Sequence, residues 1–142
     1  MAEHAEYAPI KGVRIPVQVF SDHQKFIKLT RKGVSGTVVK QAVQSLGYRE
    51  LFVRLLETTS GNLSRFYGRK ALNPYHSEGI LDTLRVFSKA ISVFGDRDIA
   101  SSWVETPIPA LGGLVPLDLC DTFEGRDLVQ ATLRKIEYGE FI

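Results

Sequence analysis

The fold is decided by a stretch of turn and helix-capping residues in the last third of the chain. It reads Val93-Phe94-Gly95-Asp96, then Ala100-Ser101-Ser102-Trp103, then Thr106-Pro107-Ile108-Pro109-Ala110-Leu111-Gly112-Gly113. Gly95 suits the end of a helix, and Asp96 suits the cap of the next one. The prolines and glycines that follow interrupt regular structure. The stretch therefore predicts short helices joined by tight loops, and it shows no pattern of catalytic residues.

Helical periodicity continues on both sides of this stretch. Ser77 suits the cap of the longest helix, about residues 78–94, whose apolar stripe is Ile80, Leu81, Leu84, Phe87, Ala90, Ile91 and Phe94. Pro116 suits the first turn of a brief helical piece. Asp121 or Thr122 caps the last helix, whose stripe is Leu128, Val129, Thr132, Leu133 and Ile136.

Two further helices are predicted nearer the N-terminus. Asp22 caps a helix that ends at Gly33, and Ser35 caps another that ends at Gly47. No internal repeat, low-complexity tract or set of strands is evident in the sequence. The fold class predicted is all-α, a compact helical bundle.

The chain divides into three predicted parts. Residues 1–21 form an N-terminal arm, which we expect to be loosely structured because Pro9, Gly12 and Pro16 break helices, with a short extended piece at 17–20. Residues 22–77 form a helical region that resembles a DNA-reading unit. Residues 78–142 form a C-terminal helical region.

Composition and charge bound the function classes. The chain has 142 residues, enough for one domain or two small subdomains, and a single cysteine, which cannot form an internal disulfide. Residues 1–77 hold 12 Lys and Arg against 5 Asp and Glu, a net charge of +7, whereas residues 78–142 hold 6 against 11, a net charge of −5. A basic half suits a polyanion and an acidic half suits a basic protein partner.

Several function classes lack a sequence pattern here. His4, His23 and His76 lie far apart and form no triad or metal-ligand spacing, so no catalytic residue and no metal site is predicted. Phosphate-cradling glycine loops are missing, so no cofactor is predicted. The apolar runs are shorter than a membrane span, and residues 1–6 are acidic and lack the apolar region of a signal peptide, so we expect a cytoplasmic protein without enzymatic activity.

Residues 48–69 have the form of a helix-turn-helix. A first helix, about residues 48–57, is followed by a polar break, and a second helix begins near Ser60 and runs to Gly68. Residues 58–77 contain no acidic side chain, which avoids repulsion of phosphates. The candidate DNA-binding residues are Ser60, Asn62, Ser64, Arg65, Arg69 and Lys70. The same spacing also occurs in three-helix bundles that bind no DNA.

The C-terminal third resembles the toxin-binding domain of the Xre/MbcA/ParS antitoxins. The phrases that carry the resemblance are Val93-Phe94-Gly95-Asp96, Ala100-x-x-Trp103, Thr106-Pro107-x-Pro109-Ala110-Leu111-Gly112-Gly113, Pro116-Leu117-Asp118-Leu119, Asp121-Thr122-x-x-Gly125 and Ile136-Glu137-Tyr138-Gly139. They occur in order over about residues 86–142. The chain departs from the family's usual residues at Ile108, Leu114 and Cys120, where only fine contacts are affected.

The resemblance implies a partner and a mechanism. Antitoxins of this family neutralise RES-domain toxins, which resemble ADP-ribosyltransferases and consume NAD, and the antitoxin's C-terminus approaches the toxin's active-site cleft. Carried onto this chain, the toxin-binding residues are Tyr138, Gly139, Glu140, Phe141 and Ile142. Family members also carry an Xre-like helix-turn-helix, which implies operator DNA as a second partner and a homodimer within a larger toxin–antitoxin complex.

Three alternatives stay open at the level of sequence. Gly139 is also what an ordinary helix end requires, and the residues after it are equally suited to fold back onto the chain's own core. The chain as a whole is also compatible with a free-standing helix-turn-helix transcription regulator that has no toxin partner. A third possibility is an interaction protein whose helix-turn-helix no longer binds DNA.

Overall fold

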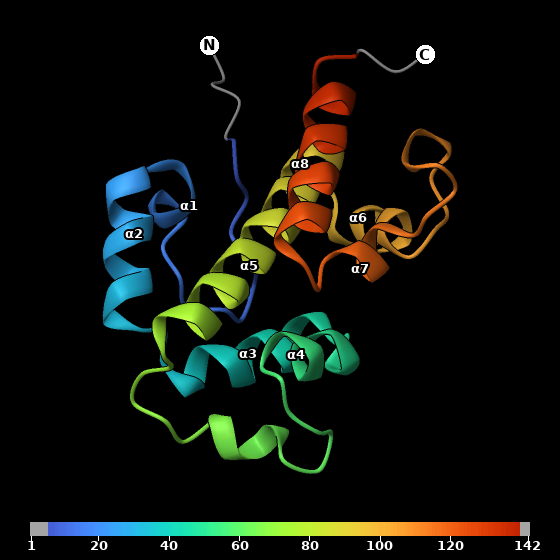
Figure 1. Cartoon of the computed structure of the whole chain (residues 1–142). Coiled ribbons are helices and arrows are strands. Elements are labelled where there is room, and N and C mark those ends of the chain that lie inside the picture. The colour runs from blue at the N-terminus through green and yellow to red at the C-terminus, as the bar shows by residue number, and fades with distance from the viewer. Residues whose placement is uncertain (1–5, 140–142) are drawn as a thin grey trace.

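The longest helix, α5 (Pro74–Phe94), runs diagonally through the middle of the molecule, and the other helices pack around it (Figure 1). The computed structural model describes residues 6–139. From the N-terminal half, α2 (His23–Lys32) and α4 (Arg49–Leu55) pack against α5. From the C-terminal half, α6 (Arg97–Val104) and α8 (Phe123–Glu137) do the same. Helix α5 is therefore shared by both halves.

The core is centred on α5. Residues 80–84 are buried at five consecutive positions, a pattern that a helix shows only when neighbours surround it. Ile80, Leu81 and Leu84 have no exposed surface. Trp103 of α6 is half-buried against this core, and its ring contacts that of Phe94 with centroids 5.6 Å apart.

Short helical pieces complete the structure. They are α1 (Gln18–Ser21), α3 (Gly36–Leu46), α7 (Pro116–Leu119) and the 3-10 turns η1 (Leu63–Phe66) and η2 (Pro109–Leu111). Within residues 6–139, β-pairing is limited to one isolated bridge between Ile108 and Leu114. The all-α class is confirmed.

The predicted helix caps are largely confirmed. Asp22, Ser35 and Asp96 each accept a backbone N–H of the first turn of the helix that follows. Thr122, rather than Asp121, caps α8, because its hydroxyl accepts the N–H of Gly125 at 3.0 Å. These side chains satisfy N–H groups that a helix leaves unpaired at its start.

The predicted start of the longest helix was wrong. Helix α5 begins at Pro74, and its cap is Asn73, whose side-chain oxygen accepts the N–H of His76 at 2.7 Å. Ser77 is buried within the first turns instead. Its hydroxyl accepts the N–H of Val34 at 2.9 Å and donates to the carbonyl of Leu72 at 3.3 Å. The Ser77 hydroxyl is therefore used in a long-range hydrogen bond with Val34 and does not cap the helix.

The N-terminal arm also differs from expectation. The piece at 17–20, predicted to be extended, enters the short helix α1. The expected loose structure is not found in residues 6–21, because Ala8 donates its N–H to the carbonyl of Ser88 at 3.2 Å and accepts the Ser88 hydroxyl. Ile10 is buried. This part of the arm is packed onto the body of the molecule.

The second helix of the predicted helix-turn-helix is not an α-helix. Only the four residues of η1 are helical between α4 and α5, and they form a single 3-10 turn. Glycines flank this turn on both sides, and 3-10 hydrogen bonding rarely extends beyond one turn. The first helix, α4, is confirmed.

Candidate functional site

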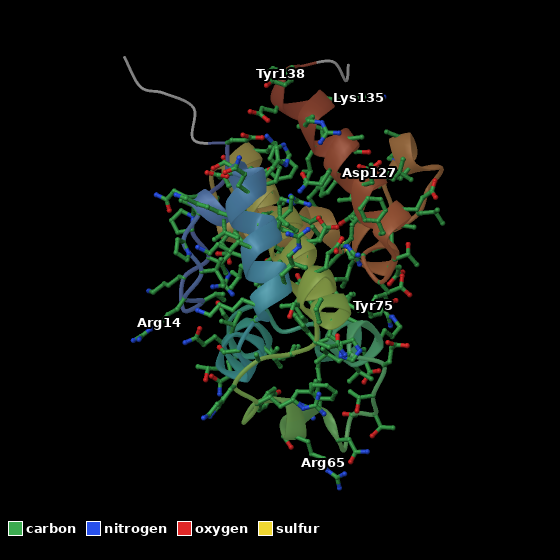
Figure 2. The ribbon with its side chains drawn as sticks, turned by 60° about the vertical axis from the view of Figure 1, so that its left-hand side comes forward. Arg14, Arg65, Tyr75, Asp127, Lys135 and Tyr138 are labelled. Atoms are coloured by element: carbon green, nitrogen blue, oxygen red, sulfur yellow. The ribbon has the colours of Figure 1, made fainter. Side chains whose placement is uncertain are left out.

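The candidate DNA-binding residues lie on one exposed loop that surrounds η1. All six of them, Ser60, Asn62, Ser64, Arg65, Arg69 and Lys70, are exposed. Arg65 projects from the end of the molecule furthest from Tyr138 (Figure 2). The loop thus brings these residues together at one surface, but without a recognition helix.

Some of these residues are engaged within the chain. Arg49 donates from Nε to the Ser60 hydroxyl at 3.0 Å and from Nη2 to the Ser60 carbonyl at 2.6 Å. The Arg69 guanidinium lies 4.1 Å above the centre of the Phe66 ring. Within residues 6–139, no ion pair involves Arg65 or Lys70. These two cations are the ones most available to phosphates.

The loop is held firmly against α3. Gly36 donates its N–H to the carbonyl of Arg69 at 2.8 Å, and Leu72 donates its N–H to the carbonyl of Val34 at 2.7 Å. The backbones approach so closely that a Cβ on Gly36 would lie 2.0 Å from the carbonyl oxygen of Phe66. The loop around η1 is therefore held in one position although it contains little regular secondary structure.

A basic helix face beside this loop was missed by sequence reasoning. Helix α2 exposes four cations in eight residues, Lys25, Lys28, Arg31 and Lys32. No acidic residue occurs between Asp22 and Glu50. The acid-free run, twenty-seven residues long, was the signal that could have found it. The basic surface of the N-terminal half extends well beyond the predicted helix-turn-helix.

The candidate toxin-binding residues begin where α8 ends. Tyr138 is 71% exposed, and its N–H closes the last turn on the carbonyl of Arg134. Gly139 has a φ of +68°, the left-handed conformation that commonly ends helices. Figure 2 shows Tyr138 at the tip of α8. Glu140, Phe141 and Ile142 lie outside the described residues.

A buried ion pair fixes the last turn of α8. The ammonium of Lys89 on α5 contacts the carboxylate of Glu137, and the two side chains are 3% and 12% exposed. The same ammonium lies 5.7 Å from the centre of the Tyr7 ring. Burial raises the pKa of the Tyr7 hydroxyl, and nearby Glu6 raises it further. The position of Tyr138 is thereby tied to α5 and to the arm.

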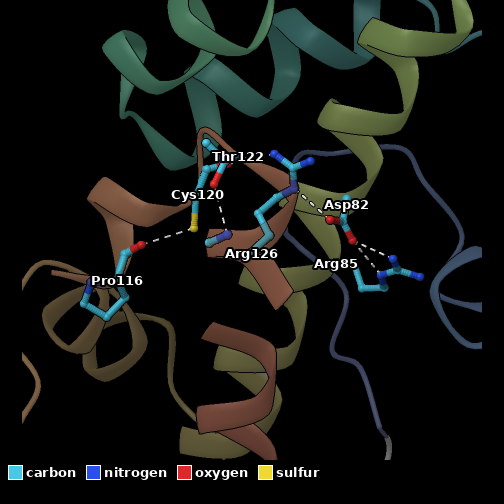
Figure 3. A network of polar contacts seen from close by, with 7 residues as sticks. Asp82, Arg85, Pro116, Cys120, Thr122 and Arg126 are labelled. Carbon is cyan, nitrogen blue, oxygen red and sulfur yellow. Dashed lines mark hydrogen bonds and ion pairs between the residues drawn. The ribbon is translucent and has the colours of Figure 1, made fainter. Parts of the chain in front are cut away.

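A second polar network joins the start of α8 to α5 (Figure 3). The Asp82 carboxylate accepts from Arg126 Nε at 2.7 Å and from Arg85 Nη2 at 2.5 Å. Arg126 Nη1 also donates to the carbonyl of Cys120 at 3.0 Å. Asp82 and Arg126 are both buried. The network locks both ends of the α7–α8 turn onto the central helix.

Cys120 is a core residue. The residue is 1% exposed, and its thiol donates to the carbonyl of Pro116 at 3.3 Å. Burial raises the pKa of the Cys120 thiol to about 12. A protonated, buried thiol is a poor nucleophile, so the environment gives no support to a reactive cysteine.

An open hollow of about 360 Å³ lies where the two halves meet, and we call it the junction hollow. One wall is α4, the second is the first turn of α5, and the third is the start of α8. Its lining residues are Arg54, Leu55, Glu57, Tyr75, Glu78, Gly79, Asp121, Thr122, Phe123 and Arg126. Arg54 and Asp121 pair across it at 3.6 Å. Sequence reasoning singled out none of these as binding residues.

No group of metal-ligating side chains occurs among residues 6–139. His76 contacts Glu57 at 3.1 Å and Asn73 at 3.4 Å, and its ring packs edge-on against Phe66. These contacts tie the first turn of α5, where His76 lies, to Glu57 and to the 3-10 turn η1. Within the same residues, no helix is long and apolar enough to cross a membrane.

Comparison with known proteins identifies the C-terminal part. Residues 89–139 match the family described as the antitoxin Xre/MbcA/ParS C-terminal toxin-binding domain. Over 126 residues the chain is 29% identical to the "Prs ADP-ribosylating antitoxin" of Sphingobium sp. (strain YBL2), covering 81% of this chain and 79% of that protein.

Two relatives named "Antitoxin Xre" match a shorter stretch. The protein from Photorhabdus laumondii subsp. laumondii is 33% identical over 76 residues, which cover 53% of this chain and 51% of that protein. The protein from Yersinia enterocolitica serotype O:8 is 36% identical over 69 residues, which cover 48% of this chain and 47% of that protein. The chain thus spans about half the length of these two relatives. The chain is thus similar to the Xre/MbcA/ParS antitoxins, and its residues 89–139 match their toxin-binding domain.

Proposed function

We propose that this antitoxin neutralises a RES-domain toxin that consumes NAD, and that it does so by occluding the toxin's active site. The observation that carries the proposal is the exposed end of α8 within a toxin-binding domain. Tyr138 stands 71% exposed at the tip of a 15-residue helix, and Gly139 turns the chain there. Similarity to the "Prs ADP-ribosylating antitoxin" supports a toxin that uses NAD, because ADP-ribosylation takes its ADP-ribose from NAD.

The mechanism is steric. Helix α8 acts as a rigid support for the residues that follow, because Lys89 and Glu137 anchor its last turn to α5. The segment from Tyr138 to Ile142 combines two aromatic side chains, one carboxylate and one aliphatic side chain. Such a segment can fill a nucleotide pocket, with its rings in the place of a base and its carboxylate in the place of a phosphate. The antitoxin performs no chemistry in this proposal.

The test is growth and intracellular NAD in cells that express the neighbouring gene's product. Three arms are compared: the toxin alone, the toxin with the full chain, and the toxin with a chain truncated after Tyr138. We expect NAD loss and growth arrest in the first arm, full rescue in the second and failed rescue in the third. The truncated chain must retain the helical circular dichroism of the full chain.

Each outcome decides a separate point. A harmless neighbour, or a full chain that fails to rescue, would remove the toxin pairing and favour a free-standing transcription regulator. Rescue by the truncated chain would keep the antitoxin function and reject the tail as the inhibitory element. Growth arrest with NAD levels unchanged would reject an NAD-consuming toxin.

We also propose that the N-terminal half binds operator DNA and so autoregulates the operon, with the chain acting as a homodimer. Support comes from the fixed loop that presents Arg65, Arg69 and Lys70, and from the four cations of α2. Because a four-residue 3-10 turn offers little surface to a major groove, phosphate contacts would dominate this binding. Relief of growth arrest without promoter binding would favour a pure interaction protein.

Promoter binding is measured as affinity against salt concentration. Replacing Arg65 with Gln should weaken binding and reduce the slope of log K against log salt by about 1, because one phosphate contact is lost. Arg97→Gln removes the same charge from the acidic half and should leave the slope unchanged. Equal slopes for both variants would reject the loop as a DNA contact. The homodimer is tested separately, by analytical ultracentrifugation of the chain without DNA or toxin.

A further inference from the structure

Two exposed aromatic rings stand on the rim of the junction hollow. Tyr75, in the first turn of α5, is 74% exposed, and Phe123, at the first position of α8, is 63% exposed. Aromatic side chains are enriched at protein interfaces, where rigid rings fill pockets and carry much of the binding energy. These rings stand on separate elements and line one hollow of about 360 Å³.

The charges of the hollow argue against nucleic acid as its occupant. Its lining holds three carboxylates, on Glu57, Glu78 and Asp121. Its two cations already have carboxylate partners, since Arg54 pairs with Asp121 at 3.6 Å and Arg126 with the buried Asp82 at 2.7 Å. A phosphate backbone would meet uncompensated negative charge here. An occupant with an apolar side chain and a neighbouring lysine or arginine fits both the rings and the carboxylates.

The position of the hollow points to the toxin. The α8 wall, from Asp121 to Arg126, lies within the matched toxin-binding domain. It is at the opposite end of α8 from Tyr138, and a 15-residue helix is about 22 Å long. A partner that engages the tail and also lies along α8 would reach this hollow.

We propose that the junction hollow is a second docking site for the toxin, separate from the C-terminal tail. An apolar side chain of the toxin enters between Tyr75 and Phe123, and an adjacent lysine or arginine faces Glu78. The inference rests on the proposed function, because the occupant is the same toxin. It adds a contact some 22 Å from the tail and extends the interface to α4, outside the matched domain.

The test measures the affinity of the full chain for the purified product of the neighbouring toxin gene. The double variant Tyr75→Ser with Phe123→Ser should bind about 100-fold more weakly, at roughly tenfold for each ring. The matched control is Ile27→Ser, which removes a 48%-exposed apolar side chain from α2, outside the hollow. It should bind within about twofold of the unchanged chain. Because all three side chains are exposed, every variant should keep the unchanged chain's melting temperature.

Charge is tested separately with Glu78→Lys, which should weaken binding, and more so at low salt. Equal binding by the double variant and the unchanged chain would overturn this inference alone and leave the tail mechanism standing. No binding by the unchanged chain would overturn both. Loss of self-association in the double variant, with toxin affinity unchanged, would assign the hollow to a second copy of this chain and also overturn the inference.

Discussion

At the scale of single residues, burial decides how much an ion pair contributes to the stability of the fold. The Asp82 carboxylate forms ion pairs with Arg85 and Arg126. The side chains of Asp82 and Arg126 are each 7% exposed. Asp121 forms an ion pair with Arg54, and the side chains of these two residues are 34% and 44% exposed, respectively. The two aspartates make similar contacts, but water competes only for the second.

Replacing Asp82 with Asn should therefore destabilise the protein strongly. The change leaves the buried Arg126 without a carboxylate, which costs about 3–5 kcal/mol in comparable buried pairs. Asp121→Asn, the matched control, should cost less than about 1 kcal/mol. Urea unfolding followed by circular dichroism measures both. A loss of the same size in the two variants would contradict the role given to the buried network.

The Cys120 thiol makes stability depend on pH in the alkaline range. Its pKa is raised from 9.0 to about 12 by burial, so the folded state binds its proton more tightly than the unfolded state does. The stabilising contribution is complete below pH 9 and is lost as the pH rises from 9 toward 12. Melting temperatures across this range should fall, and Cys120→Ala should fall less steeply. A thiol reagent at pH 8 should label only the unfolded protein.

At the scale of elements, the loop around η1 shows how a segment without regular structure becomes rigid. Its backbone hydrogen-bonds to residues 34 and 36, and the missing side chain of Gly36 allows the two backbone segments to touch. Rigidity comes from close backbone packing and not from a helix. The proposed DNA-contacting surface would therefore depend on α3 as much as on its own residues.

The prediction at this scale concerns Gly36. In Gly36→Ala the new Cβ would lie 2.0 Å from a backbone carbonyl oxygen, so the loop must move, and overpacking of this kind costs about 1–3 kcal/mol. Gly68→Ala, with open space around its Cβ, should leave stability within about 0.5 kcal/mol. Thermal melting compares the two. Two indistinguishable melting curves would show that the loop yields easily.

The sequence predicted those features that local chemistry controls. Asp22, Ser35, Asp96 and Thr122 cap helices as expected, because a cap needs only its own side chain and the next three residues. The prediction that Ser77 caps the longest helix was wrong because the sequence does not show the hydrogen bond between its hydroxyl and Val34, forty-three residues away. Asn73 followed by Pro74 was the correct signal for a helix start.

The candidate site was predictable only in part. The sequence singled out Tyr138 and Gly139, which lie at the exposed end of α8, and their role as toxin contacts stays a prediction. The junction hollow was invisible, because it is formed by residues 54, 75 and 123, which only the tertiary fold brings together. The single 3-10 turn at 63–66 was also missed, since the polar periodicity of that segment suits an α-helix equally well.

At the scale of the whole molecule, α5 packs against helices from both halves. Residues 80–84 are buried on every side, and the helices that cover them come from both halves. Cutting the chain at residue 78 would leave one side of α5 open to water. Each large apolar side chain exposed in this way costs about 1.5–3 kcal/mol.

We therefore expect the isolated segment 78–142 to lack a cooperative thermal transition, although the toxin-binding sequence lies entirely within it. The full chain should unfold in a single transition followed by circular dichroism. The comparison needs both proteins at one concentration and one pH. A sharp, cooperative melting curve for the segment would show that the toxin-binding half is an independent domain.

The hydrogen bonds between Ala8 and Ser88 have a consequence for synthesis on the ribosome. The two residues are 80 positions apart, so the arm leaves the ribosome long before its binding partner exists. At about 5–20 residues per second, the wait is roughly 4–16 seconds. During that time Ile10 has no core to enter. The arm is thus among the last segments to find its place, although it is made before the helix it packs on, and every nascent copy passes through a stage in which this segment is unpacked.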